Sequence, residues 1–237
     1  MLKINNSFDT IIIGAGFAGI GMAIRLKQNG YNSFLILERN DKIGGTWRDN
    51  NYPGCACDIP SFLYSYSFEL KPDWSNLCAP HDEILDYLNY CVKKYELKNH
   101  LRTNTLVKDV KFDEKVGKWN ITDSYNKSLE ARLVLAGVGG LNEPSYPKIK
   151  GINIFKGESF HSSNWKHDYK FEGKRVGIIG TGASSIQIIP HVADLPKKMT
   201  IFQRTAPWIS PRQNNEISNE GKERFKKYPL YNWLWRE

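Results

Sequence analysis

Residues 11–27 read IIIGAGFAGIGMAIRLK, a β-branched run that ends in a glycine-rich turn and continues with helical apolar spacing. The pattern predicts a buried strand over 9–13, a tight turn, and a helix over 20–27. A second apolar run over 33–37 predicts the next strand. Because a helix that connects two strands makes them parallel, we expect a βαβ unit and an α/β fold.

The same order of elements returns after residue 174. We expect a strand over 175–179, a glycine-rich turn, a helix over 186–192 and a strand over 199–203. The two copies predict two Rossmann-like dinucleotide-binding domains.

The region between the copies contains a long loop over 39–60 and a predicted helix over 82–95. Strands are predicted over 104–112, 119–122 and 132–136. Glycines and prolines concentrate over 139–151, as is typical of a linker. We therefore predict three parts, which are a first domain over 1–140, a linker over 141–151 and a second domain over 152–237.

Each glycine-rich turn follows a predicted strand and opens a predicted helix, the context in which G-x-G-x-x-G binds a pyrophosphate. Glu38 lies 24 positions after Gly14, and Arg204 lies 24 positions after Gly180. A carboxylate at this position binds ribose hydroxyls, whereas a guanidinium binds a 2′-phosphate. We therefore predict FAD or NAD at the first turn and NADPH at the second, where Thr205 adds a hydroxyl. Ser185 stands in place of the third glycine of the second turn.

Composition narrows the class of protein. The chain is 41% hydrophobic and 24% charged, as is typical of a globular protein. Residues 1–9 lack an apolar signal sequence, and the apolar stretch 11–24 is interrupted by four glycines, so we expect no signal peptide and no membrane span.

Four irregularly spaced cysteines predict reduced thiols in a cytoplasmic protein without a metal site. The net charge of +8 is scattered along the chain and is not interleaved with stacking aromatics. We therefore expect an anionic cofactor and no nucleic acid as the partner of the basic residues. The sequence makes no prediction of the oligomeric state.

Two further motifs carry a family resemblance. One contains Gly44-Gly45-Thr46-Trp47, four residues, Tyr52-Pro53-Gly54, three residues and Asp58. It resembles the fingerprint of type I Baeyer-Villiger monooxygenases. The other is Phe155-x-Gly157-x-x-x-His161-x-x-x-Trp165, which is similar to a signature shared with flavin-containing monooxygenases. Lys166 departs from the residue usual at its end.

The resemblance assigns residues to three groups. Those that match FAD contacts are Gly14, Gly16, Phe17, Gly19, Glu38, Thr46, Trp47, Asp58, Tyr64 and Val107. Those that match NADPH contacts are Ala56, Cys57, Gly180, Thr181, Gly182, Ala183, Ser184, Ser185, Ile186, Arg204 and Thr205. Family-signature positions are Gly45, Tyr52, Pro53, Gly54, Phe155, Gly157, His161 and Trp165. Asp58 matches a catalytic carboxylate beside the flavin, and His161 matches a structural or domain-coupling position.

The implied activity is oxidation of a ketone to an ester or lactone by O2, with FAD and NADPH as cofactors and a flavin peroxide as the oxidant. The chain matches only the N-terminal half of such an enzyme, so we expect no ester formation by residues 1–237 alone. Two alternatives stay open, which are oxidation at nitrogen or sulfur and a catalytically silent nucleotide-binding remnant. A disulfide reductase is disfavoured because Cys55 and Cys57 are separated by a single residue.

Overall fold

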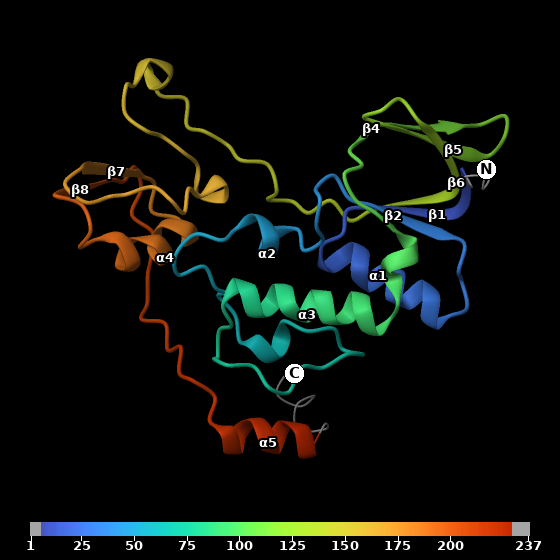
Figure 1. The fold of residues 1–237 in the computed structure, drawn as a ribbon, viewed down its shortest axis with the longest axis horizontal. Helices are drawn as coiled ribbons and strands as arrows, with labels where there is room; N and C mark the ends of the chain where they lie inside the picture. The colour runs from blue at the N-terminus through green and yellow to red at the C-terminus, as the bar shows by residue number, and fades with distance from the viewer. Residues whose placement is uncertain (1–5, 229–237) are drawn as a thin grey trace. The chain divides into compact units, whose positions relative to one another are not determined.

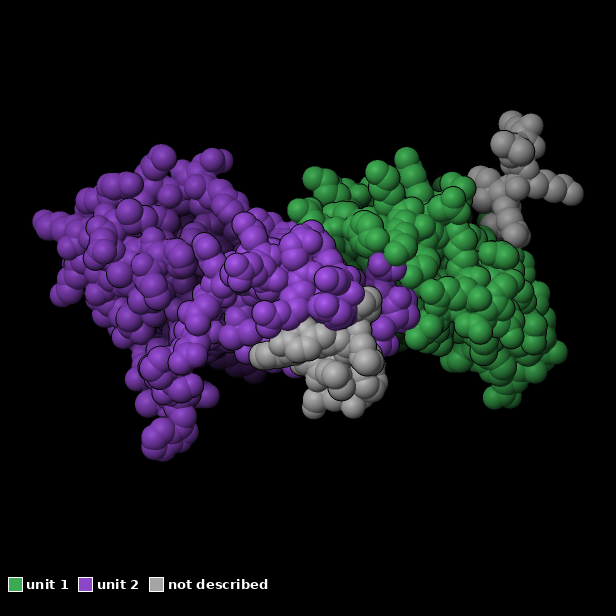
Figure 2. Space-filling view, turned by 90° about the horizontal axis from the view of Figure 1, so that it is seen from below, with its two compact units in different colours: residues 1–48, 85–142 green, residues 49–84, 143–237 purple. Residues whose placement is uncertain are grey.

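The computed structural model describes residues 6–228, and the chain divides into two compact units (Figure 2). Unit 1 comprises Met1–Arg48 and Leu85–Asn142, and unit 2 comprises Asp49–Ile84 and Glu143–Glu237.

A six-stranded sheet forms the centre of unit 1, in the order β3-β2-β1-β6-β5-β4 (Figure 1). The strands are β1 (Ser7–Ile13), β2 (Phe34–Leu37), β3 (Leu101–Arg102), β4 (Val107–Asp113), β5 (Lys118–Asp123) and β6 (Ser128–Ala136). β1 pairs in parallel with both β2 and β6, whereas β4, β5 and β6 form an antiparallel meander. All four residues of β2 are buried, as expected for a strand inside a parallel sheet.

Two long helices accompany this sheet and lie side by side in Figure 1. They are α1 (Phe17–Gln28) and α3 (His81–Lys94), of which α3 starts within the residues of unit 2. The rings of Phe17 and Tyr87 stack at a centroid distance of 6.1 Å, and Lys27 Nζ donates to the carbonyl of Tyr95 at 2.8 Å. These contacts join both ends of α1 to the middle of α3 and to the residue that follows it. A single turn, α2 (Thr46–Asp49), lies in the loop after β2.

The first glycine-rich turn brings helix α1 against the backbone of the sheet. Gly14 has a φ of +99°, which favours glycine. A Cβ on Gly19 would lie 1.9 Å from the carbonyl oxygen of Gly14, so only glycine permits this approach. The third glycine of the motif is therefore required by packing between helix and strand.

Unit 2 contains a parallel pair of strands, β7 (Arg175–Ile179) and β8 (Lys198–Phe202), joined through α4 (Ala183–Val192). A further helix, α5 (Asn219–Lys227), follows. The core of unit 2 contains Ile188 and Val192 of α4, which pack with Tyr52 and Cys55. The segment 49–84 therefore belongs to this unit because its buried side chains pack on α4.

The predicted α/β fold with two Rossmann-like units is confirmed, and so is the parallel pairing of the first two strands. The strand predicted to begin at 104 begins at Val107, because Asn104 has a φ of +52° and makes a turn. The sequence analysis missed β3, whose two residues pair with the end of β2. It also missed α2, which interrupts the predicted loop 39–60.

The predicted helix 186–192 begins earlier, at Ala183. The predicted linker 141–151 contains the boundary between units at residue 142. Residues 49–84 group with 143–237, whereas the sequence predicted that they belong to a first domain over 1–140. The predicted domain boundaries stay a proposal. Local sequence patterns do not report this grouping, because it depends on contacts between segments more than 100 residues apart.

Replacing Gly19 by alanine tests the close approach. We expect Gly19→Ala to lower the free energy of unfolding by at least about 2 kcal/mol, because the added methyl group meets backbone that cannot rotate away. Urea unfolding of the purified chain measures the change. Gly140→Ala is the matched control, since nothing in the described chain lies within 4 Å of its added Cβ, and we expect it to stay within about 0.5 kcal/mol of the parent. Equal values for the two variants would contradict the packing role of Gly19.

Candidate functional site

The N-terminus of α1 is open to an anion. Gly16 is the N-cap, no side chain within the described residues caps the helix, and its first turn carries no acidic residue. A Cβ placed on Gly16 would meet only the Cα of Gly45, at 3.7 Å. Helix N-termini attract negative charge through their free N–H groups and the helix dipole. The absence of an acidic residue and the direction of the helix dipole therefore make the turn favourable for a phosphate.

Glu38 directly follows β2 and is 4% exposed. Its Oε2 accepts the N–H of Ala15 at 2.9 Å, and its Oε1 accepts the N–H of Asn40 at 2.9 Å. Arg48 Nη1 donates to the same Oε1 at 3.2 Å. The carboxylate thus ties the end of β2 to the glycine-rich turn.

Arg48 is a residue of this site that the sequence analysis missed. Its side chain is only 13% exposed, and it also donates to the carbonyl of Lys42. A buried carboxylate left without a cation is strongly destabilising, so Arg48 maintains the charge balance around Glu38. Its position in α2, one turn after Gly44-Gly45, was the available signal.

The second glycine-rich turn lies in unit 2 and has the same order of strand, turn and helix as the first. Gly180 has a φ of +103°, and Gly182 is the N-cap of α4, whose first turn also lacks acidic residues. Nothing in the described part of the chain lies within 4 Å of a Cβ added to either glycine. Arg204 and Thr205 follow β8 and are exposed. Opposite charges therefore follow the second strand of two similar βαβ segments.

The segment around Tyr52-Pro53-Gly54 packs on α4. Tyr52 donates its hydroxyl to Gln187 Oε1 at 3.1 Å, and burial raises the pKa of Tyr52 to about 12, so the hydroxyl remains a donor. Gly54 has a φ of +78°, and a Cβ there would lie 2.3 Å from the ring of His191. This glycine is therefore needed both for its backbone angle and for the close approach of α4.

The structure divides the predicted site residues between the units. Unit 1 holds Gly14, Gly16, Phe17, Gly19, Glu38, Gly45, Thr46, Trp47 and Val107. Unit 2 holds Tyr52, Pro53, Gly54, Ala56, Cys57, Asp58, Tyr64, Phe155, Gly157, His161, Trp165, residues 180–186, Arg204 and Thr205. The residues that match FAD contacts are thus not all in one unit, because Asp58 and Tyr64 lie in unit 2.

The chain is similar to known proteins over most of its length. A family model described as pyridine nucleotide-disulphide oxidoreductase matches residues 11–231. The chain belongs to this oxidoreductase family. A Baeyer-Villiger monooxygenase of Pseudomonas aeruginosa is 46% identical over 225 residues, which cover 95% of this chain and 43% of that protein.

Solved structures of similar proteins agree with this membership. A complex of OTEMO with FAD and NADP matches with a TM-score of 0.87 at 37% identity. The match covers 94% of this chain and 44% of the OTEMO chain. A closed structure of cyclohexanone monooxygenase has a TM-score of 0.89 at 30% identity, with coverages of 98% and 44%. The resemblance inferred from the sequence is confirmed, and the chain spans about half the length of these relatives.

The family name mentions disulphides, but all four cysteines of this member are free and buried. Burial raises the pKa of Cys57 to about 11, and its thiol donates to the carbonyl of Ile59 at 3.1 Å. A buried, protonated thiol is a poor nucleophile. Within residues 6–228 no three metal-binding side chains are grouped, and no helix is long and apolar enough to cross a membrane.

The residues of the second motif make local contacts within unit 2. His161 Nδ1 accepts the N–H of Ser163 at 3.2 Å and so caps the short helix Ser162–Asn164. Trp165 packs against the core of unit 2, whereas Phe155 is 64% exposed. A Cβ on Gly157 would lie 2.5 Å from the ring of Phe155. The signature thus organises the segment that precedes β7.

Removing the cation beside Glu38 tests the charge balance of the first turn. We expect Arg48→Met to destabilise the protein by about 3–5 kcal/mol, because it leaves a buried carboxylate unpaired. The double variant Arg48→Met with Glu38→Gln should recover part of this loss, as measured by urea unfolding. Lys226→Met is the control, since its ion pair with Glu223 is exposed and is worth at most about 1 kcal/mol. A loss for Arg48→Met no larger than the control's would refute the assignment.

Proposed function

We propose that this chain forms the nucleotide-binding part of a FAD- and NADPH-dependent monooxygenase that converts a ketone to an ester or lactone. The observation that carries the proposal is the reversed charge at one register, Glu38 after the first turn and Arg204 after the second. The monooxygenase names of its relatives and the FAD and NADP of the OTEMO complex support it.

The first turn fits FAD. The N-terminus of α1, which has no acidic residue in its first turn and begins at a glycine, suits a pyrophosphate. The Glu38 carboxylate accepts three hydrogen bonds in the structure and has about one further acceptor position for a ribose hydroxyl. Gly14, Gly16, Phe17, Gly19 and Glu38 would therefore hold the adenosine diphosphate portion, with Thr46, Trp47 and Val107 as further contacts.

The second turn fits NADPH. Arg204 is an exposed guanidinium that can make paired bonds to a 2′-phosphate, and Thr205 beside it is an exposed hydroxyl. Gln203 Nε2 donates to the Thr181 hydroxyl at 3.2 Å, which links the end of β8 to the turn. Residues 180–186 would hold the pyrophosphate, and Ala56 and Cys57, which the resemblance assigns to NADPH contacts, lie in the same unit.

When bound, FAD and NADPH supply hydride transfer and the activation of O2. The protein residues bind and orient these groups. We propose that Asp58, an exposed carboxylate, acts near the reacting groups by holding a cation there. Four buried free thiols support a reducing, cytoplasmic location.

The nucleotide preference of the second turn is tested by Arg204→Ala. We expect the Kd for NADP⁺ to rise about 10- to 100-fold while the Kd for NAD⁺ hardly changes, because only NADP⁺ carries the 2′-phosphate. Isothermal titration calorimetry of the purified chain measures both constants. Arg175→Ala, which removes an exposed arginine at the start of β7, is the matched control. Equal changes for the two nucleotides would overturn the phosphate assignment.

The activity is tested on the longest protein that contains this sequence, beside the chain 1–237 itself. We expect the longer protein to form ester from a panel of ketones in proportion to the NADPH consumed, and residues 1–237 alone to form none, as measured by gas chromatography with a peroxide assay. Oxidation of amines or sulfides without any ester would identify the alternative monooxygenase. Bound flavin without any oxygenated product would support a silent nucleotide-binding remnant.

A further inference from the structure

The backbone of Ala56 is held by a single side chain. Gln187 Nε2 donates to the carbonyl of Ala56 at 2.8 Å, and the N–H of Ala56 approaches Gln187 Oε1 at 3.5 Å. The carboxamide thus pairs with both polar groups of one residue, much as a neighbouring strand would. Gln187 lies on α4, five residues after its N-cap Gly182.

The next residue, Cys57, is also held on both sides. Its N–H donates to the carbonyl of Ala79 at 2.9 Å, and Arg212 Nη1 donates to the carbonyl of Cys57 at 3.0 Å. Arg212 lies eight residues after Arg204 in the segment that follows β8. Ala56 and Cys57 directly precede Asp58, so the position of Asp58 depends on these bonds.

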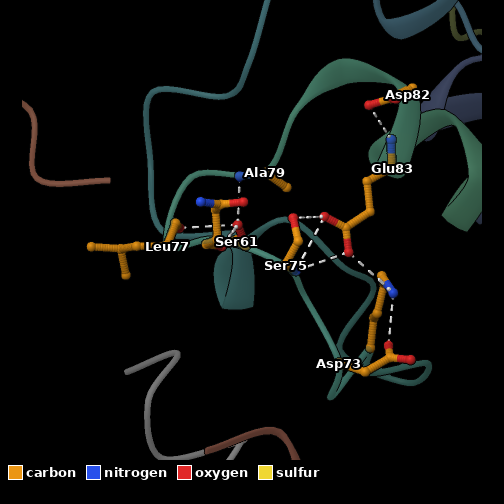
Figure 3. A network of polar contacts seen from close by, with 9 residues as sticks. Ser61, Asp73, Ser75, Leu77, Ala79, Asp82 and Glu83 are labelled. Atoms are coloured by element: carbon orange, nitrogen blue, oxygen red, sulfur yellow. Dashed lines mark hydrogen bonds and ion pairs between the residues drawn. The ribbon is translucent and has the colours of Figure 1, made fainter. Parts of the chain in front are cut away.

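Ala79, whose carbonyl accepts the N–H of Cys57, is itself held by a polar network within unit 2 (Figure 3). The buried hydroxyl of Ser61 accepts the N–H of Ala79 at 2.7 Å and donates to the carbonyl of Asn76 at 2.8 Å. Glu83, in the first turn of α3, accepts the hydroxyl of Ser75 at 2.6 Å. The segment after β8 also bonds to this region, because Asn214 Oδ1 accepts the N–H of Cys78 at 2.7 Å and the carbonyl of Asn215 accepts the N–H of Leu77 at 3.0 Å.

The other side of the segment depends on α4. Tyr52 donates to Gln187 Oε1, and the hydroxyl of Ser184 also contacts Tyr52. Gly54 lies against His191. These three α4 residues lie at spacings of three and four, and therefore share one helix face that contacts residues 52–56.

We propose that Gln187, assisted by Arg212, is a positioning residue that couples the second nucleotide turn to Asp58. The proposal rests on the proposed function, because it requires NADP⁺ to bind at the N-terminus of α4 and at Arg204. A nucleotide held there restrains α4 and the segment after β8. Gln187 and Arg212 pass this restraint to the peptide groups that precede Asp58.

The test is amide hydrogen exchange of residues 55–59 in the purified chain, with and without NADP⁺. We expect NADP⁺ to slow exchange of this segment at least about fivefold in the parent, the lower end of typical coupling between sites. Gln187→Leu should abolish this slowing while residues 180–186 are still protected by the nucleotide. Gln213→Leu, which replaces an exposed glutamine of the same unit, should behave like the parent.

Arg212→Gln is the second variant, because an exposed arginine can be replaced without disturbing the core. It should reduce the protection of 55–59 and leave the thermal unfolding midpoint near that of the parent. If both variants bind NADP⁺ by calorimetry and show the parent's protection of 55–59, the coupling role is overturned and the proposed function survives. If the parent itself does not bind NADP⁺, the proposed function fails at its second site, and the coupling fails with it.

Discussion

The contact of Gly19 with the carbonyl of Gly14 is the constraint on which the first unit depends. Since a Cβ at Gly19 would overlap that oxygen, only glycine lets α1 start directly above the end of β1. This placement aims the helix N-terminus at the turn. It also brings the Ala15 N–H within 2.9 Å of Glu38, so the carboxylate at the end of β2 is fixed relative to the turn.

The second unit uses the same backbone arrangement with different packing. Its third motif position is Ser185, and its turn glycines have open space around them within the described chain. The close contacts of this unit are made by α4, whose residues Gln187 and His191 contact residues 52–56. Both glycine-rich turns therefore share a geometry, while α4 also contacts the loop that carries Asp58.

Much of the fold followed from short-range patterns. The runs of isoleucine and leucine identified β1, β2 and β7, and the glycines identified the turns, because both signals act within a few residues. Pairs such as Glu38 with Arg48 were not foreseen, although the two residues are only ten apart. Their contact requires α2, a single helical turn inside an apparent loop, and so short an element leaves no periodic signal.

The sequence by itself determined the α/β class, the two glycine-rich turns, the opposite charges at Glu38 and Arg204, and the family resemblance, because each depends on residue type at fixed spacing. Only the tertiary structure decided that residues 49–84 pack with α4. It alone also decided that Gln187 and Arg212 hold the backbone before Asp58. Those bonds join residues 131 and 155 positions apart, and a side chain that pairs with a distant backbone group leaves no local pattern to read.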